Sequence, residues 1–174
     1  MSDLRYPTGK FSMPESVTEA IRTQWIHTIA QTPAALREAV SGLTDAQLDT
    51  PYRPEGWTVR QLVHHVADSH INAYIRFKWT LTADAPTIKT YNEKHWAELV
   101  EARTAPLSLS LPLLEALHIR WVAMLNSLTP ADYARPFVHP EWGQRTIDFI
   151  LAMYAWHGPH HVAHITALRK RNDW

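Results

Sequence analysis

Histidine is the residue type in this sequence whose number and spacing most clearly suggest chemistry. The chain has 11 histidines in 174 residues, and seven of them fall in two short windows, HHVADSH (64–70) and HGPHHVAH (157–164). Neutral imidazole is a common ligand for zinc, nickel and related divalent ions. Because the sequence contains no cysteine, such a site would use nitrogen and oxygen ligands only.

The second window contains two His-x-x-x-His pairs, His157 with His161 and His160 with His164. Residues four apart stand above one another on a helix, so either pair could place two imidazoles on one ion. With about 100° per residue, His157 and His161 lie nearer the apolar stripe of their helix. We therefore expect this pair to point inward, and His160 and His164 to lie near the rim or the surface.

A third ligand is expected from the first window, because catalytic zinc sites typically use three protein ligands and leave a fourth position open. Helical periodicity does not choose between His64 and His65. His65, however, begins a polar row with Ser69, Asn72 and Arg76, which could line a cavity. This row favours His65, and Arg76 within it could hold an anionic group of a substrate.

Three other residues near these windows are open to more than one interpretation. His70 falls in the middle of an apolar face, where it would be a packed side chain or an outer contact of a metal ligand. Asp68 and His160 are candidates for a general base, although Asp68 could equally be a solvated carboxylate. All of the histidines could also be structural residues of a helical core, in which case no metal would bind.

Both windows lie in stretches that predict long helices. Apolar residues recur every three or four positions over 59–81, and Thr58 with Gln61 has the form of a helix N-terminal capping box. Thr44 with Gln47 has the same form. The last helix is expected from about residue 146 to 170.

Two further long helices are expected. The first begins near Glu15 and is kinked or split at Pro33, and the other is entered through Pro112 and stopped before Pro130. Residues 84–106 are expected to form a crossover with a shorter helical stretch, and residues 134–146 an ordered loop or tight hairpin. Four amphipathic helices with long connections predict an all-α four-helix bundle with crossover connections, as a single domain over residues 1–174.

Charge and hydropathy exclude several classes of partner. The 17 basic residues balance the 17 acidic ones, so no excess positive field would attract nucleic acid or an anionic membrane. No window reaches about 18 uninterrupted apolar residues, as a membrane span would, and the first thirty residues lack the apolar region of a secretory signal. These features predict a cytoplasmic protein that binds neither nucleic acid nor membrane.

The sequence resembles the DinB-like superfamily and, within it, the YfiT group of metal-dependent hydrolases. The resemblance is carried by GWTVRQLVHHVADSHINAYIRFK and, about ninety residues later, by YAWHGPHHVAHI, with LRYPTGKF and LDTPYRPEGW as further matches. It implies a four-helix bundle that holds one divalent metal per chain, zinc or nickel, through three histidines. The family pattern places these on His65, eight residues after Trp57, and on His157 and His161.

The resemblance also implies a homodimer and a small-molecule substrate. A hydrolase would use the metal to activate water, whereas related enzymes are S-transferases that activate a low-molecular-weight thiol cosubstrate such as bacillithiol. A non-catalytic metal-binding or stress-response protein is the alternative from another class, and His70 or His164 would then complete a closed four-ligand site. The sequence departs from an ordinary helix at Pro159, which predicts a local kink or opening beside Gly158.

Overall fold

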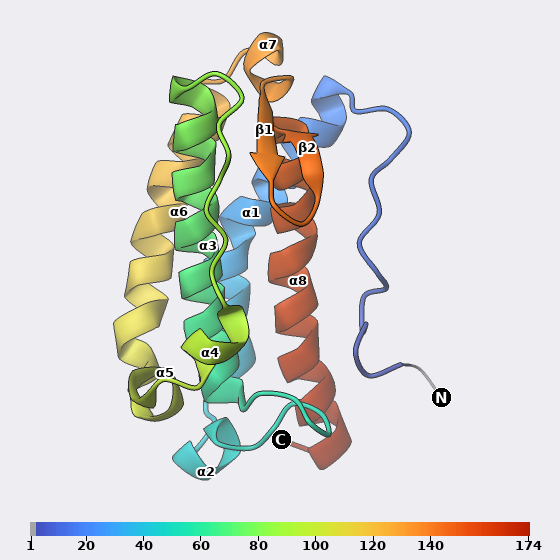
Figure 1. The fold of residues 1–174 in the computed structure, drawn as a ribbon. Coiled ribbons are helices and arrows are strands. Elements are labelled where there is room, and N and C mark those ends of the chain that lie inside the picture. Colours follow the sequence, from blue (N-terminus) through green and yellow to red (C-terminus); the bar gives the residue numbers. More distant parts are fainter. Residues whose placement is uncertain (1–2) are drawn as a thin grey trace.

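The computed structural model describes residues 3–174, and four long helices make up most of it (Figure 1). They are α1 (Glu19–Val40), α3 (Val59–Thr82), α6 (Ser110–Asn126) and α8 (Ile147–Asn172). Shorter elements connect them: α2 (Asp45–Leu48), α4 (Glu93–Ala97), α5 (Val100–Thr104), the 3-10 turn η1 (Leu107–Leu109), α7 (Pro130–Tyr133), β1 (Pro136–His139) and β2 (Gly143–Thr146). The predicted four-helix bundle with crossover connections is confirmed.

The helices are connected across the bundle rather than around it. Helix α1 packs against α6 and α8, and α3 packs against the same two helices, so α1 and α3 occupy opposite corners. Helices α1 and α8 run parallel, because their contacts join corresponding ends. Arg22 near the start of α1 bonds to Asp148 near the start of α8, and Arg169 near the end of α8 donates to the oxygen of Ala39 near the end of α1. Helices α3 and α6 are also parallel, because the long connection over 83–109 returns along the bundle before α6 begins (Figure 1).

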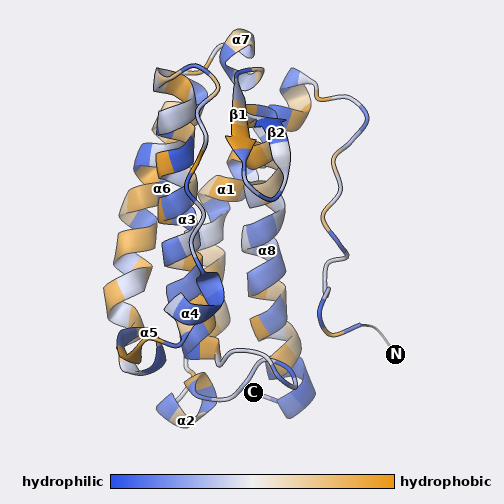
Figure 2. Cartoon of the chain, viewed as in Figure 1, coloured by the Kyte–Doolittle hydropathy of each residue, from blue (hydrophilic) through white to orange (hydrophobic). Residues whose placement is uncertain are grey.

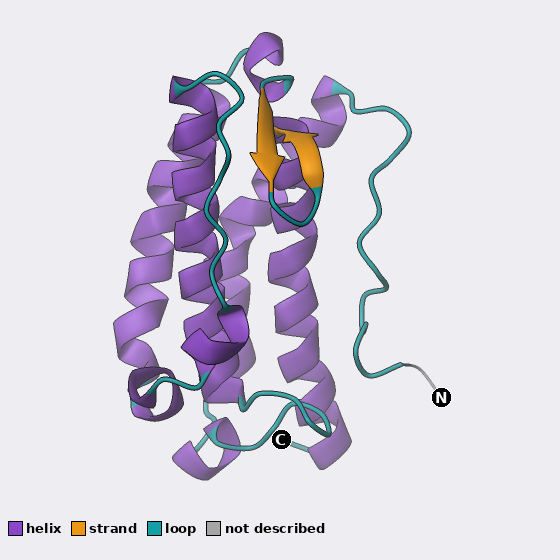
Figure 3. Ribbon diagram, viewed as in Figure 1, coloured by secondary structure: helices purple, strands orange, loops and turns teal. Residues whose placement is uncertain are grey.

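The helix ends follow from local sequence. Both predicted capping boxes are present, Thr44 with Gln47 on α2 and Thr58 with Gln61 on α3. The expected hairpin is also present: β1 and β2 pair antiparallel, with Phe137 opposite Arg145, and the short strands stand out among the helices in Figure 3. Residues 86–88 hydrogen-bond to Val138 of β1, which fastens the crossover to the hairpin.

Two expectations about proline are corrected in part, because neither helix is interrupted in the structure. Helix α1 continues through Pro33 and is not split, and α8 continues through Pro159 without an opening. Helix α1 also begins at Glu19, four residues later than expected, with Thr18 as its N-cap. Both prolines lie where α1 and α8 are held in the bundle by their neighbours, so packing offsets the lost backbone hydrogen bonds.

Apolar side chains line the interior in two clusters that continue along the bundle axis. One cluster includes Leu36, Leu62 and Ile165, and the other includes Phe77, Trp121 and Leu151. Polar residues interrupt this interior along the facing sides of α3 and α8, where Figure 2 shows hydrophilic stretches on both helices. One segment, Leu107–Asn126, is long and apolar enough to cross a membrane by length and composition.

Candidate metal centre

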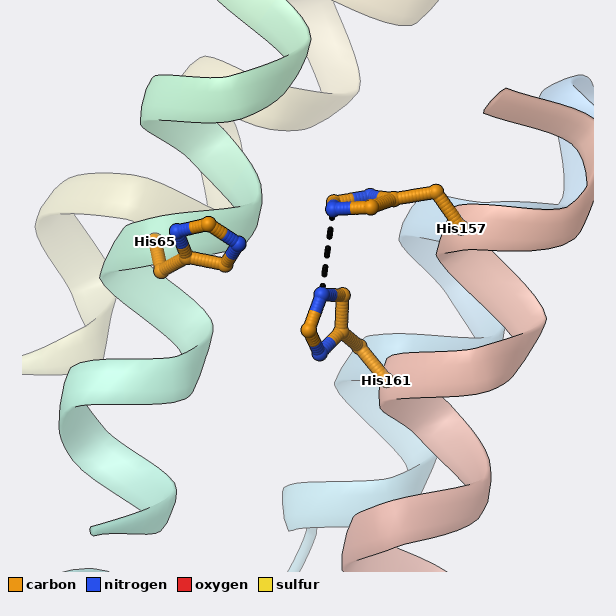
Figure 4. A group of neighbouring side chains, drawn as sticks. All are labelled: His65, His157 and His161. Carbon is orange, nitrogen blue, oxygen red and sulfur yellow. Dashed lines mark hydrogen bonds between the residues drawn. The ribbon is translucent and has the colours of Figure 1, made fainter. Parts of the chain in front are cut away.

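Three imidazoles converge between α3 and α8 (Figure 4). His65 comes from α3, and His157 and His161 come from successive turns of α8. One ring nitrogen from each residue lies within 4.8 Å of the other two, and the Nε2 atoms of His157 and His161 are 3.1 Å apart. Two nitrogens on one tetrahedral zinc ion would be separated by about 3.4 Å, so this spacing suits a shared ion.

The three rings are neutral, and two of them have no hydrogen-bond partner outside the group among residues 3–174. The Nδ1 atoms of His65 and His161 are buried and have no hydrogen-bond partner within residues 3–174, although buried polar groups are nearly always satisfied. Burial lowers the pKa of His65 to about 4 and the pKa values of His157 and His161 well below their ordinary range. The rings are therefore neutral near pH 7, which is the form that binds a metal.

His157 is further held by two histidines that stack across the bundle core. Its Nδ1 lies 3.1 Å from Nε2 of His70, and Nδ1 of His70 lies 2.7 Å from Nε2 of His118. Nδ1 of His118 lies 2.7 Å from the backbone oxygen of Ile29. A carbonyl only accepts, so His118 carries its proton on Nδ1, His70 then donates from its own Nδ1, and so does His157. Each ring fixes the tautomer of the next, and Nε2 of His157 is left with a free lone pair.

The carbonyl that begins this chain is available because of Pro33. In an α-helix the backbone oxygen of residue 29 would accept from the amide of residue 33, but proline has no amide hydrogen. Ile29 therefore has an unused acceptor on a fully buried residue, and His118 of α6 supplies the donor. A proline in α1 thus determines the tautomer of a histidine on α8, through α6 and α3.

The structure separates His64 from His65. His64 uses both ring nitrogens to hold the crossover, with Nδ1 2.7 Å from Oγ of Ser110 and Nε2 3.1 Å from the oxygen of Ala105. It has no nitrogen left for a metal. His65 instead packs against Trp57, with ring centroids 4.6 Å apart, and turns toward α8.

The second pair on α8 is placed differently from the expectation. His160 and His164 are buried, not exposed at the rim, and their Nε2 atoms are 3.1 Å apart. The N-terminal segment covers His160: Thr8 contacts it, and Gly9 accepts a hydrogen bond from Trp156, whose ring stacks on His160. His164 packs against Tyr52 instead, with ring centroids 4.3 Å apart. Helical periodicity places a residue relative to its own helix and carries no information about a segment 150 residues away.

Two cavities adjoin the three imidazoles. One of about 840 Å³ is lined by all three and by Trp57 and Trp156. A second, of about 570 Å³, is lined by Ser69 and Arg76 of the predicted polar row and by residues of the hairpin. His157, Glu93 and Lys94 line both cavities, so the two spaces meet beside the imidazoles.

The other candidates occupy different positions. His160 lines the larger cavity, whereas Asp68 lines neither cavity; burial and the nearby Glu101 raise the pKa of Asp68 to about 6. His70 contacts His157 but is not among the three converging rings, and His164 bonds to His160. His118 was not among the predicted site residues, although it lies four residues after Leu114 on the buried stripe of α6.

Comparison with known proteins agrees with the fold and with a metal-dependent chemistry. The sequence pattern of the DinB superfamily matches residues 28–165. Two relatives named "Putative metal-dependent hydrolase", from Bacillus mycoides strain KBAB4 and Bacillus cereus strain ATCC 10987, are each 52% identical over the whole of both chains.

Solved structures show the same arrangement of helices. YfiT from Bacillus subtilis, described as a probable metal-dependent hydrolase with an unusual four-helix bundle topology, superposes with a TM-score of 0.96 at 49% identity, covering 98% of each chain. TT2238, a four-helix bundle protein, superposes with a TM-score of 0.57 at 20% identity, covering 84% of this chain and 98% of its own. The second similarity concerns the fold alone.

Proposed function

Because the chain belongs to the DinB superfamily, we propose that it is a divalent-metal-dependent hydrolase whose ion is held by His65, His157 and His161. The observation that carries this proposal is the convergence of three neutral imidazoles beside a cavity. We take the whole of residues 1–174 as the catalytic domain. Similarity to relatives named metal-dependent hydrolases supports the same reaction class.

The number of ligands favours an enzyme over a structural metal protein. Within residues 3–174 the converging group contains three residues and no fourth histidine or carboxylate, which is typical of catalytic zinc sites. A divalent ion held in this way, zinc or nickel, supplies a water nucleophile near neutral pH by lowering the pKa of water in its open position. The three neutral rings bring no charge of their own.

The surrounding residues hold the imidazoles in place and supply a proton acceptor. His70 and His118 orient the ring of His157, and Trp57 packs against His65 and shields it from solvent. Of the two candidate bases only His160 lines the cavity, so we assign proton transfer to His160. Burial lowers the pKa of His160 to about 4, so the ring is neutral near pH 7 and can accept a proton, and its Nδ1 lies 3.4 Å from the Thr8 hydroxyl.

Metal content tests the centre directly. Untagged protein purified without added metal should contain about one divalent ion per chain by mass spectrometry. His65→Ala, His157→Ala and His161→Ala should each lose it, because two imidazoles hold a divalent ion weakly. His27→Ala, which removes an exposed histidine on α1, is the matched control. Metal retained in the three variants, or absent from the wild type, would contradict the proposal.

The reaction itself needs a second assay, because an S-transferase would use the same centre. The metal-loaded protein should hydrolyse members of a panel of esters and amides without added thiol, and a chelator should abolish the activity. If turnover requires a low-molecular-weight thiol, the protein is an S-transferase and the proposed hydrolase function is wrong. Homodimerisation, a cytoplasmic location, and the absence of nucleic-acid and membrane partners stay predictions from the sequence.

A further inference from the structure

The smaller cavity contains a buried positive charge that no described residue neutralises. Arg76 is 6% exposed, and none of the ion pairs formed within residues 3–174 involves it. Its Nε has no hydrogen-bond partner in the same part of the chain, and its Nη2 makes only a long contact of 3.4 Å with the oxygen of Lys89. A buried guanidinium is normally paired, so this one has unused bonding capacity where it lines the cavity.

Two neutral donors line the cavity with Arg76. The Tyr91 hydroxyl is buried and lacks a hydrogen-bond partner among the described residues. His139 accepts hydrogen bonds at Nδ1 from the backbone amides of Glu141 and Trp142, at 3.1 and 3.3 Å. Burial and the neighbouring Arg76 lower the pKa of His139, so the ring is neutral and its single proton is on Nε2. Three donors and one positive charge therefore share this space.

We propose that the smaller cavity binds a carboxylate group of the substrate, held by Arg76, Tyr91 and His139. The planar guanidinium pairs with a carboxylate through two parallel hydrogen bonds, and a single positive charge matches a monoanion. The other charged residues that line the cavity, Glu93, Lys94 and Glu141, are exposed, and their net charge is negative. They do not supply the further positive charge that a phosphate dianion would require.

The position of this subsite indicates the shape of the substrate. His157 lines both cavities, so a molecule with its carboxylate at Arg76 could extend past His157 to the three converging imidazoles. This step rests on the proposed hydrolase function, and it restricts the substrates to small acids whose carboxylate is separate from the scissile bond. Binding of the carboxylate itself does not depend on the metal.

Nuclear magnetic resonance can test the subsite without any turnover. In ¹⁵N-labelled protein, the Arg76 Nε–H signal, identified by its loss in Arg76→Gln, and the amide signals of Glu141 and Trp142 would report binding. The probes are acetate, neutral acetamide and inorganic phosphate at constant ionic strength. Each is titrated into metal-loaded and chelator-treated protein, so that loss of the metal site and loss of the subsite give different results.

We expect acetate to shift these signals saturably in both forms and acetamide to leave them unchanged. Tyr91→Phe should weaken acetate binding roughly tenfold, the effect of one hydrogen bond to a charged group, and Arg76→Gln should abolish the shifts at Glu141 and Trp142. Arg76→Lys keeps the positive charge but loses the two parallel N–H donors of the guanidinium, so it should bind acetate more weakly than wild type. Arg120→Gln, which removes an exposed charge on α6, should bind normally.

Three outcomes would overturn the proposal. The first is the absence of a saturable shift with acetate, and the second is an equal response to acetamide. The third is unchanged affinity in both Tyr91→Phe and Arg76→Lys, two variants that test the site even if Arg76→Gln fails to fold. Tighter binding of phosphate than of acetate would also contradict the proposal, and would indicate that the cavity binds a phosphate group of the substrate.

Discussion

His157 differs from the other two converging imidazoles because its Nδ1 has a hydrogen-bond partner, whereas the Nδ1 atoms of His65 and His161 have none among residues 3–174. Its Nδ1 is fixed by His70, which is fixed by His118, which donates to Ile29. A metal ligand whose second nitrogen donates a hydrogen bond is oriented and made more basic. We therefore expect His157 to contribute more to metal affinity than His65 or His161, because a hydrogen bond already orients its ring.

Removing His118 should disturb the metal site without touching a ligand. In His118→Leu the proton of His70 has no fixed position, so we expect metal affinity to fall by about 10- to 100-fold in a chelator competition assay. The Nδ1–H tautomer of metal-free His157 should also become mixed in long-range ¹⁵N–¹H spectra. His118→Gln, whose amide can both donate to Ile29 and accept from His70, should lie closer to wild type. An unchanged tautomer in His118→Leu would refute this role.

At the scale of elements, the close approach of α1 and α8 depends on Gly158. A Cβ atom at this position would come within 2.6 Å of Cγ2 of Thr32 and would also overlap the Thr32 hydroxyl. Gly158→Ala should therefore lower the free energy of unfolding by about 1–3 kcal/mol, the usual cost of overpacking, measured by urea denaturation. The double variant with Thr32→Ala should recover part of this loss. Equal destabilisation in the single and double variants would place the strain elsewhere.

The elements that the sequence predicted correctly are those encoded by local pattern. The stripe over 59–81 and the capping box at Thr58 and Gln61 identified α3. Two histidine pairs on the last helix have i, i+4 spacing, and the position of His157 and His161 nearer the apolar stripe identified the pair that faces α3. Local rules failed where a distant element decided the outcome. Pro33 was expected to interrupt its helix, but α1 continues because α6 and α8 pack against it, and His118 binds the carbonyl that proline leaves free.

The same reasoning explains the site residues that the sequence did not reveal. His118 looks like any polar position on a buried stripe until α6 and α1 are adjacent. The burial of His160 depends on the N-terminal segment. Arg76 was a candidate for binding an anionic group, but the other side of the proposed subsite comes from a hairpin more than 60 residues later in the chain. Side-chain periodicity indicates which face of a helix is buried, and tertiary packing determines what that face contacts.

For the whole molecule, the density of buried histidines makes stability depend on pH. Burial lowers the pKa values of eight histidines below their ordinary range, among them His118, whose pKa falls to about 4. The unfolded chain takes up these protons near pH 6.5, whereas the folded chain does not until the pH approaches the lowered pKa. Stability is therefore greatest above pH 6.5 and falls as the pH decreases toward 4.

Urea denaturation of chelator-treated protein at several pH values should show this dependence. His118 alone should account for roughly 2 kcal/mol of lost stability at pH 5 relative to pH 7.5, because burial lowers its pKa to about 4. His118→Gln cannot titrate in this range but can keep both hydrogen bonds, so its stability should fall less steeply with pH than that of wild type. Comparing the two chains cancels the contribution of the carboxylates, which is common to both. Parallel curves would mean that the pKa of His118 is the same in the folded and unfolded chains, and that burial does not keep this ring neutral as the pH falls.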